Sequence, residues 1–217
     1  MTPVVHRTPC KQSATLNRLA GKKISLKLEN LQKTGSFKVR GAYNEISQLS
    51  DEVCANGILA ASAGNHAQGV ALAGQKRGVP VTVFMPETTP QAKVMATRQY
   101  GAIVKLNAAR TQPTIAEGIG VKEPGMLTTN VILSLVDEVL TVTEQEIASA
   151  ILFMLEREKM LVEGAGAAAV AAALAGYLPA GSGSTGIIVS GGNLDIAKLV
   201  RCHELVAGLN PAVLSIL

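Results

Sequence analysis

Three short apolar segments, each followed by a polar turn or a segment with helical spacing, set the fold of the first half of the chain. The expected strands are Gly57–Ala61, Pro80–Met85 and Ala102–Leu106. Helices are expected from the turn Ser62–His66 to about Lys76, and from Pro90 to Tyr100. Because strands joined by helices run parallel through right-handed crossovers, this order predicts a parallel sheet. We therefore expect an α/β protein with open parallel-sheet layers and helices on both faces.

The remaining elements follow from the same periodicities. Further strands are expected at Ile24–Leu28, Val136–Val142, Met160–Val162 and Gly186–Ser190. Further helices are expected at Thr15–Ala20, Val39–Leu49, Ala165–Ala175 and Leu194–Val206. A helix from Thr143 to about Glu158 is favoured by a capping box, in which Thr143 and Glu146 bond each other's backbone N–H groups. A turn at Glu123–Gly125 and a loop at Pro179–Thr185 connect these elements.

Composition excludes several classes of function. The 217 residues are 47% apolar, enough for a sizeable core, and the net charge of +4 is dispersed without the basic face that nucleic-acid binding needs. Cys10, Cys54 and Cys202 lack metal or disulfide spacing, which favours a reducing compartment. The longest apolar run, Gly164–Leu178, is too short to span a membrane and predicts a buried helix. We expect a cytoplasmic protein with no nucleic-acid or membrane partner.

Two glycine patterns are weak signals for dinucleotide binding. Gly181–Gly186 is a literal GxGxxG, but it precedes a strand when it should follow one. Gly164–Ala169 opens a helix after Leu161–Glu163, yet Asp195 lies too far along the chain to serve as the acidic ribose ligand. We interpret the first pattern as a linker and the second as the start of a buried helix.

Lys38 stands where a turn runs into a helix, between Phe37 and Val39 and close to Arg40. A lysine attacks carbonyl groups only when its amine is partly uncharged, and apolar neighbours or a nearby cation favour that form. An arbitrary lysine at a helix start is usually solvated. The local pattern therefore indicates a candidate reactive amine without deciding the matter.

Two polar turns follow predicted strands elsewhere in the chain. Ser62–Gly69 follows the strand Gly57–Ala61, and Ser190–Asn193 ends the strand that starts at Gly186. Open α/β sheets bind ligands at the carboxyl ends of their strands, and a helix start offers free N–H groups to anions. Each turn could be an ordinary connection, but both have the position of a ligand site.

The sequences of these segments resemble those of the threonine dehydratase (threonine ammonia-lyase) family. This family uses pyridoxal phosphate (PLP) and has the two-domain tryptophan-synthase-β-like fold. The segments that carry the resemblance are Lys27–Ala42, Ser62–Gly69, Glu163–Gly166 and Ser190–Asn193. The match covers roughly Thr15–Leu106 and Thr114–Asp195. It implies that Lys38 holds PLP as a Schiff base and is the catalytic residue.

The resemblance also implies roles for the residues around Lys38. The substrate loop would comprise Ser62, Ala63, Gly64, Asn65 and His66. The cofactor contacts would be Lys38, Phe37, Asn65, Ser190, Gly191 and Glu163. Racemases of this fold carry a second serine where Ala63 stands, and a methyl group transfers no proton, which favours elimination. Ser190 would bond the pyridine nitrogen, and its neutral hydroxyl suits β-elimination.

The resemblance breaks between its two blocks. Leu106–Pro113 runs directly into Thr114–Ile119, which resembles sequence well downstream in the family. Family members carry between these points the end of the small domain and a glycine run whose amides hold the PLP phosphate. We expect weakened cofactor binding, and a parallel sheet that either closes over the gap or exposes apolar edges. The expected division is a large PLP-binding domain of residues 1–42 and 113–217 and a small substrate domain of residues 43–112.

The expected function is that of a PLP-dependent ammonia-lyase, which converts L-threonine and L-serine to the corresponding 2-oxoacids and ammonia. Family habit implies a homodimer or tetramer. Three alternatives stay open: a serine racemase or another PLP enzyme of this fold, a shortened inactive member that serves as a binding or regulatory protein, and a spliced or truncated version of a longer enzyme.

Overall fold

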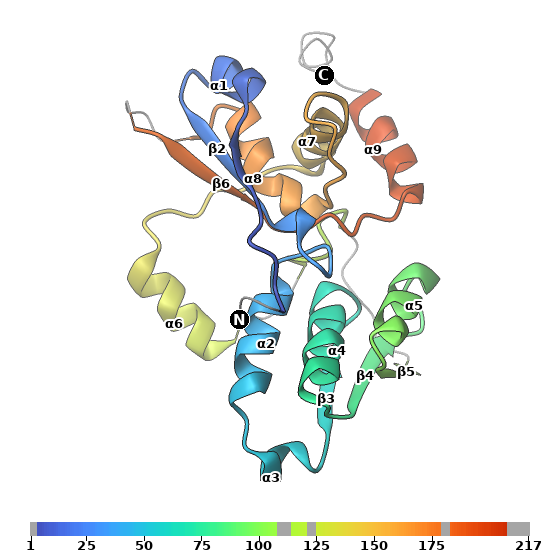
Figure 1. The fold of residues 1–217 in the computed structure, drawn as a ribbon. Helices are drawn as coiled ribbons and strands as arrows, with labels where there is room; N and C mark the ends of the chain where they lie inside the picture. Colours follow the sequence, from blue (N-terminus) through green and yellow to red (C-terminus); the bar gives the residue numbers. More distant parts are fainter. Residues whose placement is uncertain (1–3, 108–113, 121–124, 179–182, 208–217) are drawn as a thin grey trace.

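The computed structural model describes residues 4–107, 114–120, 125–178 and 183–207. Within them the chain forms two units, each built on a three-stranded sheet (Figure 1). The first sheet has the order β1-β2-β6 and the second the order β3-β4-β5. The strands are β1 (Cys10–Gln12), β2 (Ile24–Leu28), β3 (Ile58–Ala61), β4 (Val81–Pro86), β5 (Ile103–Asn107) and β6 (Thr185–Val189).

The second sheet confirms the predicted parallel order. Both β3 with β4 and β4 with β5 are parallel, with Ile58 opposite Val81 and Thr82 opposite Ile103. The crossover helices are α4 (Asn65–Arg77) and α5 (Gln91–Gln99). Helix α2 (Lys38–Gln48) packs along α4, and the short α3 (Asp51–Cys54) leads back to β3 (Figure 1). Alternate residues of β4 are buried against these helices, as a strand with one covered face requires.

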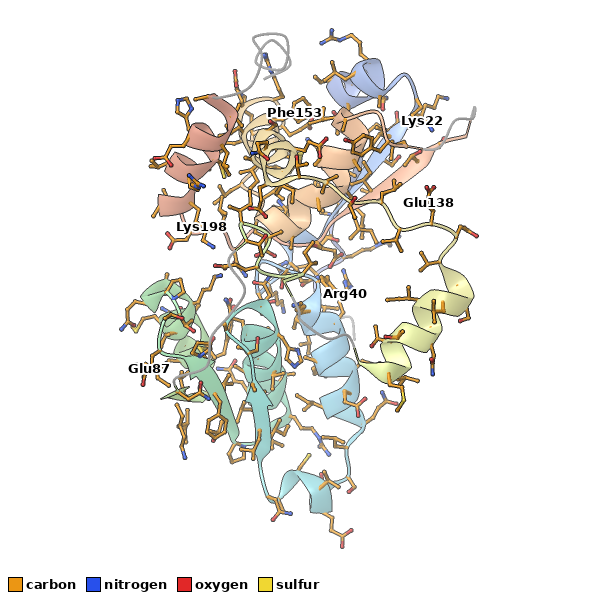
Figure 2. All side chains as sticks on the ribbon, turned by 180° about the vertical axis from the view of Figure 1, so that it is seen from behind. Lys22, Arg40, Glu87, Glu138, Phe153 and Lys198 are labelled. Carbon is orange, nitrogen blue, oxygen red and sulfur yellow. The ribbon has the colours of Figure 1, made fainter. Side chains whose placement is uncertain are left out.

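The first sheet brings together distant parts of the sequence. Strand β2 pairs in parallel with β6, and the unpredicted β1, only three residues long, pairs with β2 in the antiparallel sense. The helices of this unit are α1 (Ala14–Ala20), η1 (Glu29–Leu31), α7 (Glu144–Glu156), α8 (Gly164–Leu174) and α9 (Ala197–Ala207). Phe153 is fully buried in its core (Figure 2), and the capping box of Thr143 and Glu146 is present.

Two predicted strands are wrong. Residues 136–142 are irregular and follow a helix that the sequence did not suggest, α6 (Met126–Leu135), and residues 160–162 are also irregular. An alternating pattern forms a strand only beside a neighbour that completes its backbone hydrogen bonds, and no described strand lies beside either segment. The predicted helix at Leu194 starts later, at Ala197, where the Asp195 carboxylate accepts a bond from the backbone N–H. The turn at Glu123–Gly125 and the loop at Pro179–Thr185 fall mostly outside the described residues.

Exposed apolar side chains mark several surfaces. No residue of α6 is buried, and Leu127 and Leu133 are each 79% exposed. Leu59, Ile103 and Ile188 are exposed on the sheets. The apolar run predicted as a buried helix forms α8, and among the described residues we find no helix with the length and hydropathy of a membrane span.

The predicted division into domains stays a prediction. Its boundary after residue 42 cuts through α2, which is one continuous helix. Ala42 and Ile46 of α2 pack together into the core of the second unit. The boundary between the two units therefore lies close to Lys38, at the start of α2.

Candidate active site

A cavity of about 270 Å³ lies between the two units. It is bordered by the segments that follow the carboxyl ends of β3, β4 and β6, where parallel sheets bind their ligands. The wall is formed by Lys38, Ser62–Asn65, Pro86, Thr88–Pro90, Lys93, Ile115, Glu117, Gly118, Gly120, Glu163–Ala165, Asn193–Asp195 and Lys198. The predicted catalytic lysine and most of the predicted substrate loop thus share one cavity.

Lys38 is the first residue of α2, and its position is fixed from behind by α4. A Cβ atom at Gly69 of α4 would lie 3.1 Å from the carbonyl carbon of Lys38 and from the backbone nitrogen of Val39. The two helices therefore touch backbone to backbone behind the lysine. Among the described residues no carboxylate forms an ion pair with Lys38, so its amine is available to a ligand in the cavity.

Two neighbours of Lys38 do not have the role that the sequence suggested. Arg40 forms two 2.8 Å bonds to the carboxylate of the buried Glu29, so it is not the free cation expected beside Lys38 (Figure 2). Phe37 is 43% exposed and is not among the residues that line the cavity, and its predicted contact with the cofactor stays a prediction. The surroundings of Lys38 are therefore formed by α4 and by the other residues of the cavity wall.

Asn65 lies at the centre of a hydrogen-bond network across the cavity floor. Its side-chain nitrogen donates to Glu163 Oε1 at 2.5 Å, and its oxygen accepts from Asn193 Nδ2 at 2.8 Å. Asn193 Nδ2 also donates to the backbone oxygen of Thr34 at 2.7 Å. A primary amide nitrogen carries two protons, so Asn65 has one N–H left for a ligand. The network joins both units at the start of α4.

The substrate loop connects β3 to α4. The backbone N–H of Ser62 bonds the oxygen of Phe84 at 3.0 Å, which continues the sheet, and the Ser62 hydroxyl accepts from the N–H of Gly64 at 3.3 Å. No side chain caps the start of α4 at Gly64. The first N–H groups of this helix therefore have no intrahelical acceptor and suit a carboxylate.

The carboxyl of Glu163 has a pKa above its usual value. Burial raises the pKa of its carboxyl, against the opposing effects of the hydrogen bond from Asn65 and of the charges of Lys93 and Lys38. A carboxyl with a raised pKa in the folded state stabilises the protein at acidic pH and loses that contribution as the pH rises through its folded pKa.

We expect Glu163→Gln to raise the melting temperature above that of the native protein once the pH exceeds the usual glutamate pKa of 4.5. The amide keeps an oxygen that accepts from Asn65, and it carries no charge to bury. Thermal unfolding between pH 4 and pH 8 measures the difference. A gain that grew toward acidic pH would contradict the assigned direction.

Three other predicted site residues lie beside the cavity but outside its wall. Burial lowers the pKa of His66, and the positive charge of Lys38 lowers it further. Ser190 meets the Lys38 segment through its backbone oxygen, which accepts from the N–H of Phe37 at 3.0 Å. A Cβ atom at Gly191 would lie 2.1 Å from Glu163 Oε1, so this glycine packs directly on that carboxylate. The roles predicted for these residues stay predictions.

Sequence reasoning missed Lys93, Glu117 and Lys198, which line the opposite wall. Lys93 lies in the first turn of the helix that follows β4, and Ser62 lies in the turn that follows β3. Both residues lie beyond the carboxyl end of a strand, and this position could have indicated Lys93 as a site residue. Glu117 and Lys198 show no comparable pattern. Asn193 was quoted as part of a motif, and the structure joins it to Asn65.

Residues 1–109 and 104–191 match the family model described as pyridoxal-phosphate dependent enzyme. The chain belongs to this family. It is 35% identical to the L-threonine ammonia-lyase of Thermotoga maritima, over 91% of this chain and 74% of the relative. It is 32% identical to a catabolic L-threonine dehydratase of Staphylococcus aureus, over 97% and 90%. The maize serine racemase structure matches with a TM-score of 0.86 and 27% identity, over 94% of this chain and 93% of the other.

The relatives carry an internal stretch that this family member lacks. The alignment with the Thermotoga protein extends over 297 positions, more than the 217 residues of the chain. The two stretches that match the family model meet at residues 104–109, at the end of β5. The predicted break between two blocks is confirmed. No run of glycines stands in the sequence near this junction.

The residues around the cavity fit PLP, a flat ring that carries an aldehyde, a hydroxyl and a phosphate. Lys38 offers an amine to the aldehyde, and Asn65 offers its remaining N–H to the hydroxyl. The hydroxyl of Thr89 is buried in the wall without a hydrogen-bond partner among the described residues, as a donor to a ligand oxygen would be. The cavity therefore has donors for the polar groups of this cofactor.

Proposed function

We propose that the protein is a PLP-dependent ammonia-lyase that dehydrates and deaminates L-threonine, and L-serine by the same route. The observation that carries the proposal is one cavity that holds the unpaired Lys38 amine, the open start of α4 and the Asn65 network. Threonine ammonia-lyase relatives support the choice of substrate class. The products are 2-oxobutanoate from threonine, pyruvate from serine, and ammonia.

The chain's own residues bind and orient the amino acid. The hydroxyl of Ser62 and the N–H of Asn65 receive its carboxylate, because these donors lie at an uncapped helix start, and the N–H of Gly64 holds the Ser62 hydroxyl in place. Bound PLP supplies the electron sink that takes up the electron pair left at the substrate's α-carbon. Lys38 Nζ would hold the cofactor until the substrate amine displaces it, and the freed amine then removes the α-proton. The β-hydroxyl takes up that proton and departs as water, and a second water later replaces the amino nitrogen and releases ammonia.

Ala63 favours elimination over racemisation. A racemase needs a second acid on the face of the substrate opposite its lysine, and the methyl group of Ala63, which lines the cavity, transfers no proton. We expect Ala63→Ser to add slow formation of D-serine from L-serine, because the hydroxyl enters the cavity wall beside Ser62. Chiral chromatography of the amino-acid pool measures it. A variant that forms no D-serine while it still deaminates L-serine would show that position 63 does not decide the reaction.

The direct test of the proposed reaction is the product formed from each amino acid. The protein is incubated with PLP and L-threonine, and 2-oxobutanoate and ammonia are measured with time. Equal amounts of both products support the ammonia-lyase. D-serine from L-serine without 2-oxoacid would favour a racemase, and no product from any amino acid would favour a binding role for the shortened chain.

A further inference from the structure

Two lysines from different units meet at one carboxylate in the cavity wall. Lys93 of α5 lies 2.9 Å from Glu117, and Lys198 of α9 forms a still closer ion pair with the other oxygen of the same carboxylate. Figure 2 shows Lys198 on the end of α9 that faces α5. The side chains of Lys93 and Lys198 are only 14% and 24% exposed. Two half-buried ammonium groups thus share a single negative charge.

A buried hydroxyl completes this wall. Thr89 is 9% exposed, lines the cavity, and its oxygen has no hydrogen-bond partner among the described residues. It lies one turn before Lys93, and no side chain caps the start of α5 at Pro90. A buried hydroxyl without a partner is rare, because the lost hydrogen bond costs free energy. The combination of a free hydroxyl, an open helix start and two ammonium groups is a donor set for a multiply charged oxyanion.

Two other acids, Asp195 and Glu163, line the same cavity. The Asp195 carboxylate accepts a hydrogen bond from the backbone N–H of Ala197, and among the described residues it forms no ion pair with Lys93 or Lys198. Burial raises the pKa of Glu163, against the opposing effects of the hydrogen bond from Asn65 and of the charge of Lys93. Glu117 is the one carboxylate that faces both lysines, and their hydrogen bonds outweigh its burial and keep its pKa below the usual value. Each ammonium group therefore shares its one carboxylate partner with the other, and its remaining N–H groups can bind a further anion.

We propose that Thr89, Lys93 and Lys198 form an oxyanion subsite that receives the phosphate of PLP in this chain, and that Glu117 competes with the phosphate for the two lysines. This inference rests on the proposed function, because it takes Lys38 as the group that holds the aldehyde end. In this chain no glycine run stands near the junction at residues 104–109 where the family's phosphate loop is expected. Side-chain cations then replace backbone amides as phosphate donors.

The test compares PLP with pyridoxal, which has the same ring and aldehyde but no phosphate. Dissociation constants are measured from the absorbance change near the visible edge, and inorganic phosphate is titrated separately by calorimetry. In Lys93→Met and in Lys198→Met we expect PLP to bind about tenfold more weakly, because each loses one charge-assisted hydrogen bond, while pyridoxal binds as before. Glu117→Gln should strengthen both PLP and phosphate binding, because the competing carboxylate is gone.

Lys76→Met is the matched control, since Lys76 lies in the exposed last turn of α4 and outside the cavity. It should change neither affinity, and circular dichroism confirms that each variant is folded. The subsite is overturned if the ratio of the two dissociation constants is unchanged in both lysine variants, or if Glu117→Gln weakens phosphate binding. If neither aldehyde attaches to Lys38 in the native protein, the proposed function fails, and the phosphate titration still decides the subsite.

Discussion

Replacement of Lys38 by methionine is expected to abolish both the covalent attachment of PLP and the formation of 2-oxobutanoate. Methionine keeps the length of the side chain at the start of α2 but has no amine. Loss of a positioned acid or base alone costs about 10²–10⁴-fold in rate, and here the attachment of the cofactor is lost as well. The absorbance of the protein after addition of PLP and the rate of 2-oxoacid formation are the two readouts.

The control for this substitution is again Lys76→Met, which removes an amine from the exposed surface of α4. It should keep the absorbance change and the rate of the native protein. A rate of 2-oxoacid formation in Lys38→Met within about tenfold of the native rate would contradict the assignment of Lys38. The loss of a positioned base costs more than that.

Replacement of Gly164 by alanine is expected to have the largest effect on stability. Gly164 is the first residue of α8, and a Cβ atom there would lie 2.2 Å from the backbone oxygen of Ile115 and 2.9 Å from the Cα of Ala116. Both obstacles are backbone, so no side chain can rotate away. We expect a loss of about 3 kcal/mol, at the upper end of the range for overpacking. The segment that carries Glu117 must also move, so PLP binding should weaken with stability.

Gly41→Ala is the matched control for the glycine substitution. Gly41 lies inside α2, and a Cβ atom there would meet nothing within 4 Å. Alanine is more favourable than glycine in a helix interior by about 1 kcal/mol, so this variant should be more stable than the native protein. Urea unfolding of both variants gives the two free energies. Equal effects of the same sign would show that the close contact at Gly164 is absent in solution.

Local patterns were sufficient for the elements that carry the cavity. Strands β3, β4 and β5 follow from short apolar segments, and helices α4 and α5 from the segments between them, because each strand lies beside a neighbour or against helices that stabilise it. The segment Val136–Val142 has a similar pattern and forms no strand, since no described strand lies beside it. The periodicity of a segment indicates which secondary structure it prefers, and a neighbouring strand decides whether it forms a strand.

The site was predicted where its residues follow one another in sequence. Their sequence motifs indicated the loop Ser62–Asn65 and Lys38, and the structure places all of these residues in the wall of one cavity. The opposite wall comes from three separate segments of the chain. Glu117 and Lys198 resemble ordinary surface charges in the sequence, and only Lys93 has the position of a ligand residue after a strand. Their meeting depends on the packing of the two units, which no local pattern encodes.

The most direct test of the account is the position of PLP on the chain. The native protein is incubated with PLP and reduced with borohydride, and its peptides are examined by mass spectrometry. We predict one modified residue, Lys38, at the start of α2 and in the cavity wall. Lys93 and Lys198 lie in the same cavity and serve as internal comparisons. Modification of either of these lysines in place of Lys38, or of no lysine in the cavity, would contradict the account.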